Sequence, residues 1–197
     1  MHFFDIKNLV EAVGLIGIFS FIFAESGLFF GFFLPGDSLL FTAGILAAAS
    51  YFNIWYLLIG CFIFAVLGDS VGYWFGHKTG PKIFSKPNSL FWNKKNLDKT
   101  EEFFKKYGNK TITLARFVPI VRTFAPIMAG VGNMKYKTFL AWNMLGAFFW
   151  TMGITLLGYF LGNSVKNIDQ YILPIVLLII LVSVIPVLIH FFQKNKV

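Results

Sequence analysis

Four charged side chains stand in otherwise apolar stretches of this chain: Glu25, Asp37, Arg116 and Arg122. Carboxylates can take up and release protons, and guanidiniums present a planar fork of donors that suits phosphate. In a bilayer core, each such group left alone would cost roughly 2.5 to 3.5 kcal/mol. Two acids and two arginines form a neutral set, so we expect them to compensate one another in one polar site or to face water.

The composition indicates which solvent surrounds these stretches. Of the 197 residues, 57% are hydrophobic and only 13% are charged, and the mean hydropathy is +0.70. These values lie far from those of an ordinary soluble domain. The sequence therefore predicts an all-α integral membrane protein with a single membrane domain over residues 1–197. The single cysteine, Cys61, excludes an intramolecular disulfide.

About four transmembrane helices should carry the site. Residues 54–76, 138–162 and 171–192 each come close to the roughly 20 apolar residues that cross a bilayer. Residues 9–24 are shorter and contain Glu11, so they are expected to span with a tilt or to lie partly in the interface.

Two further apolar segments, residues 25–50 and 111–133, contain proline and should not form straight helices. The residues expected to break them are Pro35, Gly36, Pro119 and Pro126. Broken backbone at membrane depth is tolerated only inside protein or along an aqueous cavity. Both segments are therefore interpreted as re-entrant hairpins, the first carrying the two acids and the second the two arginines.

Lysine placement predicts the orientation. Residues 77–110 contain nine lysines against three acids, which makes this loop cytoplasmic by the positive-inside rule, and two lysines place the C-terminus on the same side. With helix 54–76 running inward and helix 138–162 running outward, the two hairpins should open to opposite faces.

An internal repeat agrees with this topology. A constant offset of 86 residues superimposes two halves, about 9–76 and 95–162, most visibly as GYWFG at 72–76 against GYFLG at 158–162. Because the matched helices should run in opposite directions, the pattern indicates an inverted-topology repeat of the kind found in transporters.

Three motifs make the chain recognisable. They are FFLPGD, whose Asp37 follows Glu25 by twelve residues; GDSVGYWFG at 68–76; and RFVPIVRTFAPIMAG at 116–130. With these motifs the chain resembles the DedA family, also called the SNARE-associated or VTT-domain family, of bacterial inner-membrane proteins, over nearly its whole length.

The resemblance implies a lipid carrier. Members of the family are associated with translocating polyprenyl phosphate, notably undecaprenyl phosphate, across the cytoplasmic membrane in dependence on the proton-motive force, and eukaryotic relatives look like phospholipid scramblases. Carried over to this chain, Arg116 and Arg122 would bind phosphate, and Glu25 and Asp37 would couple transport to protons. The expected partners are thus a polyprenyl phosphate or phospholipid and protons.

Simpler roles remain open for these residues. The arginines could form structural salt bridges with the acids. Asp37 could merely cap a helix starting at Ser38, since Asp is a good N-cap. Asp69 is only a secondary candidate for the site. It lies near the cytoplasmic end of its helix, and that position favours an interfacial role.

Other function classes fit less well. The sequence has no phosphate-binding loop, HExxH or CxxC motif, and its three histidines lack metal-ligand spacing, so neither an enzyme nor a metal or other cofactor is expected. Nucleic acid is not an expected partner. The alternatives are a proton-coupled exchanger of small ions or solutes and a structural membrane factor. The exact lipid and the oligomeric state, monomer or homo-oligomer, stay open.

Overall fold

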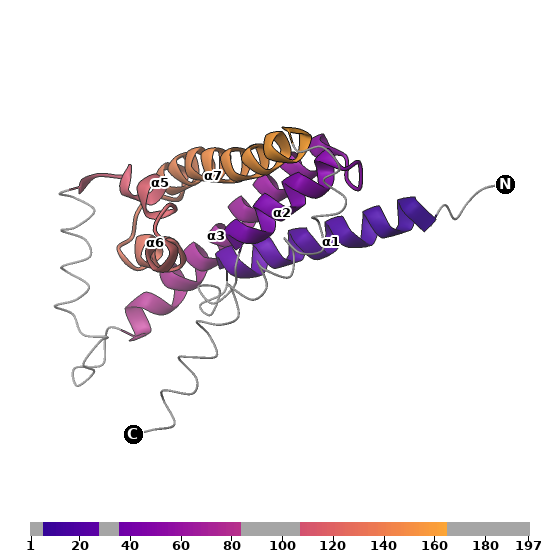
Figure 1. Cartoon of the computed structure of the whole chain (residues 1–197). Helices are drawn as coiled ribbons and strands as arrows, with labels where there is room; N and C mark the ends of the chain where they lie inside the picture. The colour runs from indigo at the N-terminus through magenta and orange to yellow at the C-terminus, as the bar shows by residue number, and fades with distance from the viewer. Residues whose placement is uncertain (1–5, 28–35, 84–106, 165–197) are drawn as a thin grey trace, which may run out of the picture. The chain divides into compact units, whose positions relative to one another are not determined.

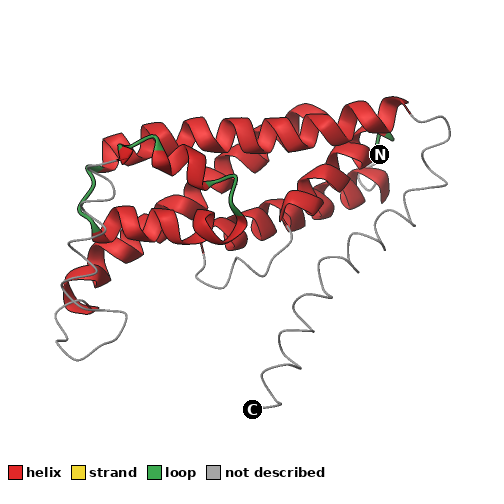
Figure 2. Ribbon diagram, turned by 60° about the vertical axis from the view of Figure 1, so that its left-hand side comes forward, coloured by secondary structure: helices red, strands yellow, loops and turns green. Residues whose placement is uncertain are grey.

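The computed structural model describes residues 6–27, 36–83 and 107–164, and every regular element in these ranges is an α-helix (Figures 1 and 2). The helices are α1 (Ile6–Gly27), α2 (Gly36–Ala48), α3 (Ile54–Ile83), α5 (Thr111–Ala115), α6 (Pro119–Val131) and α7 (Tyr136–Ser164). The all-α prediction is confirmed for the described part of the chain.

Helices α3 and α7 are long and apolar enough to cross a membrane. The qualifying stretches are Ile54–Thr79, with 26 residues and a mean hydropathy of 2.0, and Tyr136–Ser164, with 29 residues and a mean hydropathy of 1.6. About 20 residues suffice to span the hydrocarbon core. The helices expected at 54–76 and 138–162 are therefore confirmed, whereas the one expected at 171–192 lies outside the described residues.

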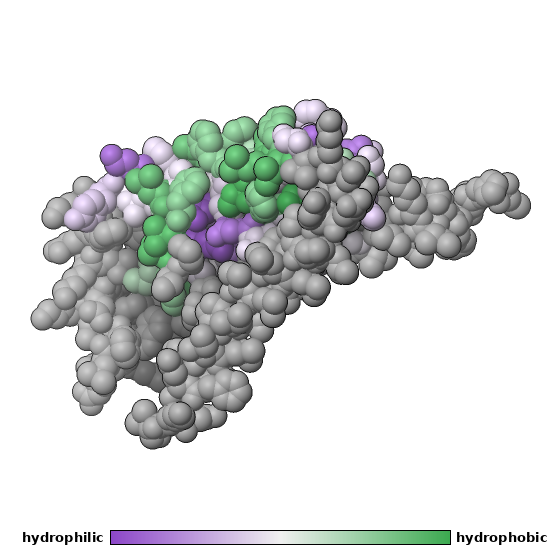
Figure 3. Space-filling model, in the orientation of Figure 1, coloured by the Kyte–Doolittle hydropathy of each residue, from purple (hydrophilic) through white to green (hydrophobic). Residues whose placement is uncertain are grey.

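The outer surfaces of α3 and α7 are apolar as well. Exposed large hydrophobic residues include Ile59, Ile63 and Leu67 on α3 and Leu145, Phe149 and Leu157 on α7. Hydrophobic residues cover much of the coloured part of the surface in Figure 3. Helices that are apolar all round suit a lipid environment, because hydrocarbon imposes no cost on such side chains.

Glu25 lies in the last turn of α1 and not on the segment that carries Asp37. No proline interrupts residues 6–27, and the helix expected at 9–24 continues through Glu25 to Gly27. The prediction that both acids share one hairpin is wrong in this respect. Of the two breaks predicted before Asp37, Gly36 begins α2, and Pro35 lies outside the described residues.

The second proline-containing segment is broken once. Helix α5 ends at Ala115, Val118 is extended with φ −114° and ψ 110°, and Pro119 begins α6. Proline suits a first helical position, because the amide hydrogen that it lacks would have no partner within the helix there. The predicted break at Pro119 is confirmed.

Pro126, in contrast, does not break the chain, and this prediction is wrong. The residue lies inside α6, which continues to Val131. A proline at this position deprives the carbonyl of Arg122 of its intrahelical donor, yet the segment stays helical. Pro126 and Ile127 contact α3 at Gly72, at 3.5 and 3.6 Å from a Cβ built there.

The described chain divides into two compact units. Of the described residues, unit 1 comprises 6–21, 36–61 and 151–164, and unit 2 comprises 22–27, 62–83 and 107–150. Each unit is described by itself.

In each unit a short helix packs on the C-terminal half of a long helix at a glycine. In unit 1, a Cβ at Gly44 of α2 would overlap backbone atoms of α7 at Thr155 and approach the amide of Tyr159. In unit 2, a Cβ at Gly130 of α6 would overlap the backbone of α3 at Tyr73. Only glycine permits such close approach of two helices.

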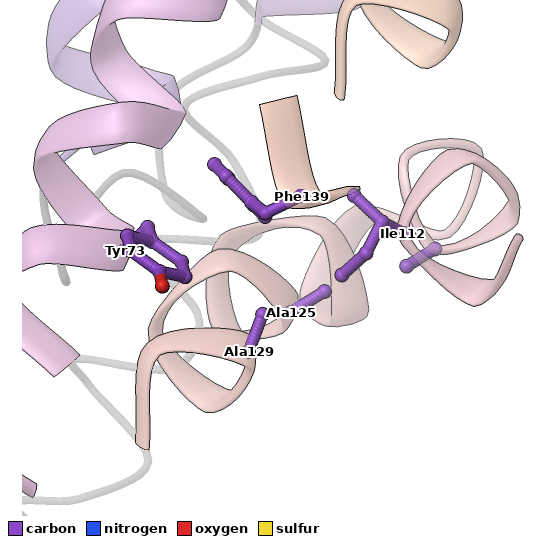
Figure 4. Packing of buried hydrophobic residues seen from close by; sticks show 6 residues of the cluster. Tyr73, Ile112, Ala125, Ala129 and Phe139 are labelled. Atoms are coloured by element: carbon purple, nitrogen blue, oxygen red, sulfur yellow. The ribbon is translucent and has the colours of Figure 1, made fainter. Parts of the chain in front are cut away.

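The core of unit 2 joins α3, α5, α6 and α7. Its buried members are Tyr73, Ile112, Ala115, Ala125, Ala129 and Phe139 (Figure 4). The rings of Tyr73 and Phe139 stack with centroids 4.6 Å apart, and the Tyr73 hydroxyl donates to the carbonyl of Met134. This packing fixes α6 against α3 next to the charged residues described below.

Candidate functional site

Arg116 forms a buried ion pair with Asp69 in unit 2. The arginine directly follows α5, and its Nη1 donates a hydrogen bond to Oδ2 of Asp69 in α3. Both residues are 5% exposed. At such burial each charge depends on the other, because a lone ion in low dielectric is costly.

Asn143 of α7 holds the same arginine from a second helix. Its Oδ1 accepts a hydrogen bond from Arg116 Nη1 at 2.7 Å, and its Nδ2 donates to the carbonyl of Val66 in α3 at 3.3 Å. The side chain of Asn143 is fully buried. Because the amide bridges a carbonyl of α3 and the guanidinium, Arg116 is fixed by both long helices.

Arg122 pairs with Glu25. It lies in the first turn of α6, and its Nη2 donates to Oε1 of Glu25 in α1; the two side chains are 12% and 1% exposed. A glycine contact positions the carboxylate: a Cβ at Gly27 would come within 2.9 Å of the Gly68 carbonyl. The end of α1 can therefore lie directly on α3, one residue before Asp69.

The indole ring of Trp150 contacts both arginines. The guanidinium carbons of Arg116 and Arg122 lie over the indole of Trp150, 5.3 and 5.0 Å from the ring centroid. Trp150, in α7, is 2% exposed. Both distances fall within the range of cation–π attraction, which is strongest for tryptophan and for desolvated ions.

Thr123 adds a polar group beside Arg122 in the sequence. It is 2% exposed, and its hydroxyl has no hydrogen-bond partner among the residues that the structure describes. A buried hydroxyl without a partner carries a desolvation cost, which a hydrogen bond to a ligand oxygen would relieve.

Of the four predicted charged residues, Glu25, Arg116 and Arg122 lie in unit 2, and the fourth charged residue of the site there is Asp69. The two arginines and Glu25 meet Asp69 as two ion pairs of zero net charge. Asp69 is buried halfway along α3 and bonded to Arg116, and its position relative to the membrane interface stays a prediction.

Asp37 belongs to unit 1, and its participation in the site stays a prediction. It is half-buried and lies in the first turn of α2, which starts at Gly36 and not at Ser38 as expected. A carboxylate in the first turn of a helix is stabilised by the positive end of the helix dipole.

Sequence reasoning missed Asn143 and Trp150. For Asn143 a signal was present, since it is the one strongly polar residue in the apolar run TFLAWNMLGAFFW, and polar residues in membrane helices usually face partners. For Trp150 there was none, because it is one of five tryptophans in an aromatic-rich chain.

These features define a class of protein. Two helices can cross a bilayer by length and composition, and charged residues within unit 2 pair with each other and are buried from the surroundings. A helical membrane protein with an internal polar site fits this description.

The comparisons give the family. The VTT domain matches residues 34–160. The chain is 43% identical over 197 residues to Protein DedA of Escherichia coli (strain K12), covering 96% of this chain and 90% of the relative. It is 45% identical over 168 residues to an uncharacterized membrane protein of Mycobacterium leprae, covering 85% and 75%. The chain belongs to the DedA family of VTT-domain membrane proteins.

A more distant relative, an uncharacterized membrane protein of Synechocystis, is 33% identical over 172 residues, covering 87% of this chain and 78% of the relative. No solved structure matches the chain.

Proposed function

We propose that this protein moves a lipid phosphate across the cytoplasmic membrane, with undecaprenyl phosphate or a related polyprenyl lipid or phospholipid as substrate, and that protons drive the movement. The observation that carries the proposal is the pair of arginines in unit 2, Arg116 buried and Arg122 partly buried, each bonded to a carboxylate. Guanidinium groups bind carboxylate and phosphate with the same planar geometry. A phosphate headgroup can therefore take the place that a carboxylate occupies.

The two ion pairs suit different roles. Arg116 is tied to Asp69 and to Asn143, on two long helices, so it provides a fixed positive charge. Arg122 pairs with Glu25, which lies at the end of α1. In the proposed cycle, Glu25 takes up a proton and releases Arg122, and Arg122 then binds the phosphate. The net charge of the site is conserved when the bound headgroup carries one negative charge, as in a phosphodiester or a singly protonated phosphate monoester, because the anion then replaces the carboxylate charge that the proton removes.

An inverted repeat with two re-entrant hairpins would supply alternating access. The glycine contacts support it: Gly44 meets Tyr159 in unit 1 as Gly130 meets Tyr73 in unit 2. Adding 86 to 44 gives 130, and adding 86 to 73 gives 159. Each short helix thus packs on the long helix of the opposite sequence half, within one helical turn of the equivalent position, since the closest contact of Gly44 is the Thr155 carbonyl, as expected for related halves that exchange helices.

Orientation can be tested by labelling with a membrane-impermeant thiol reagent. In a Cys61→Ala variant, Tyr51→Cys and Lys135→Cys introduce one thiol each at an exposed position next to α2 or α6. Hairpins that open to opposite faces predict labelling of residue 51 from the periplasm and of residue 135 from the cytoplasm, the side also proposed for residues 77–110 and the C-terminus. Labelling of both from one side would contradict the inverted repeat.

Transport is tested with purified protein in liposomes that contain radiolabelled undecaprenyl phosphate. A membrane-impermeant phosphatase releases phosphate from the outer leaflet only. With the protein present, release should exceed that pool, and an imposed proton gradient should change its rate. Release that stops at the outer-leaflet fraction would contradict lipid translocation, and proton-coupled uptake of a small solute in its place would favour the exchanger.

A further inference from the structure

We propose that Trp150 is the positioning residue of the two-arginine site: its indole holds the guanidiniums of Arg116 and Arg122 in register for one anionic headgroup. The inference rests on the proposed function in one respect, since it takes a lipid phosphate as the bound anion. It assigns a role to a residue that carries no charge and that no sequence motif identifies.

The backbone alone does not fix the spacing of the two arginines. Arg116 follows α5, Arg122 lies in α6, and the extended residue Val118 and the start of α6 at Pro119 separate them. A continuous helix would set the directions of two side chains by its regular turn, but this segment has no such continuity. Asp69, Asn143 and Glu25 place the guanidiniums separately, and a contact shared by both couples their positions.

Trp150 provides this shared contact. It comes from α7, outside the α5–α6 segment, and both guanidinium carbons lie over its ring at 5.3 and 5.0 Å from the centroid. Its 2% exposure means that little water competes for either cation. Hydrogen bonds join Asp69 and Asn143 to Arg116, and Glu25 to Arg122, and Asp69 also attracts Arg122 electrostatically.

The chemistry of the indole suits a permanent partner. Two guanidiniums close together repel each other, and the negative face of an aromatic ring offsets part of this repulsion. Tryptophan has no side-chain hydrogen-bond acceptor, only the indole N–H donor. The ring therefore attracts the cations without competing with phosphate oxygens for their N–H groups. A carboxylate must leave when the anion arrives, whereas the ring can stay.

Graded fluorination of the indole separates this role from simple packing. Fluorine atoms on the ring weaken the negative face stepwise while the shape changes little. Unmodified, monofluoro-, difluoro- and trifluorotryptophan are placed at position 150 by nonsense suppression. Matched series use position 142, a half-buried tryptophan on the same helix, and 5-methyltryptophan at position 150, which adds bulk without withdrawing electrons.

The probe is farnesyl phosphate, a short polyprenyl phosphate, titrated into detergent-purified protein. We expect its Kd to rise in steps with each fluorine, by about tenfold over the whole series, with the thermal unfolding temperature nearly constant. The series at position 142 and the methyl variant should keep the Kd of the unmodified protein.

Three results would overturn the inference. A flat series at position 150 would show that the ring face does not act on the arginines. An effect of 5-methyltryptophan as large as that of trifluorotryptophan would show that packing alone matters. Absence of binding to the unmodified protein would overturn both this inference and the proposed substrate. Binding with the expected gradient, but without translocation in liposomes, would leave Trp150 in its role and reject lipid transport.

Discussion

Arg116 donates a hydrogen bond to Asp69, 47 residues away in the chain and on a different helix. Both side chains are buried in unit 2, and Asn143 completes the contact from α7. This pairing adds Asp69 to the set of charged residues that the sequence predicted for the site. The carboxylate partner of Arg116 is a residue of the long helix α3, so one of the two ion pairs is built on a helix that is long and apolar enough to cross a membrane.

Asp69→Asn should destabilise the protein by about 3 to 5 kcal/mol, because it leaves a buried guanidinium without its counter-charge. Arg116→Gln should cost a similar amount for the opposite reason. The double variant should recover much of the loss, since no unpaired ion then remains. Denaturant unfolding in detergent gives the three free energies of unfolding. Additive losses in the double variant would mean that the two side chains are not energetically coupled.

Arg122→Lys keeps the positive charge but loses the planar fork. We expect binding or transport of the lipid phosphate to fall by about 10- to 100-fold, the value of one charge-assisted hydrogen bond, while membrane insertion stays normal. Arg116→Lys should impair function as well. Liposome assays at equal protein content measure the effect. Full activity of both lysine variants would mean that positive charge alone suffices.

Gly44→Ala and Gly130→Ala should each destabilise the protein, because the added methyl group would overlap backbone atoms of the facing helix, which cannot move aside as a flexible side chain can. We expect losses of about 1 to 3 kcal/mol. Gly153→Ala is the matched control: it lies in α7 with no atom within 4 Å of the added carbon. It should be neutral or stabilising by up to about 1 kcal/mol. Equal behaviour of all three in thermal unfolding would contradict the close helix packing.

Asp37→Asn tests whether this residue serves protonation or only its helix. Asparagine keeps a polar side chain in the first turn of α2 but cannot exchange a proton, and the loss of the favourable dipole interaction should cost only about 0.3 to 1 kcal/mol. We expect the variant to fold and to lose proton-linked transport. The comparison is made at matched expression and matched thermal stability, with and without an imposed proton gradient. Wild-type transport under both conditions would assign Asp37 to the helix start alone.

Much of the fold follows from local sequence. The long apolar runs specify α3 and α7, because a chain in hydrocarbon must satisfy its backbone hydrogen bonds within each segment. Pro119 specifies the start of α6, because a proline is compatible with the first helical position. The charges of Glu25, Arg116 and Arg122 also predict a polar site, because an isolated ion in an apolar membrane segment is too costly to leave unpaired.

The partners in that site were decided by tertiary structure. Sequence gives the types of the charged residues but not which side chains meet, because pairing depends on how closely the helices approach and at which level. The glycine contact between Gly27 and Gly68 brings Glu25 to the helix that carries Asp69, and α7 adds Asn143 and Trp150. Charge and hydropathy alone therefore identify the chemistry, whereas the close packing of helices selects the residues that perform it.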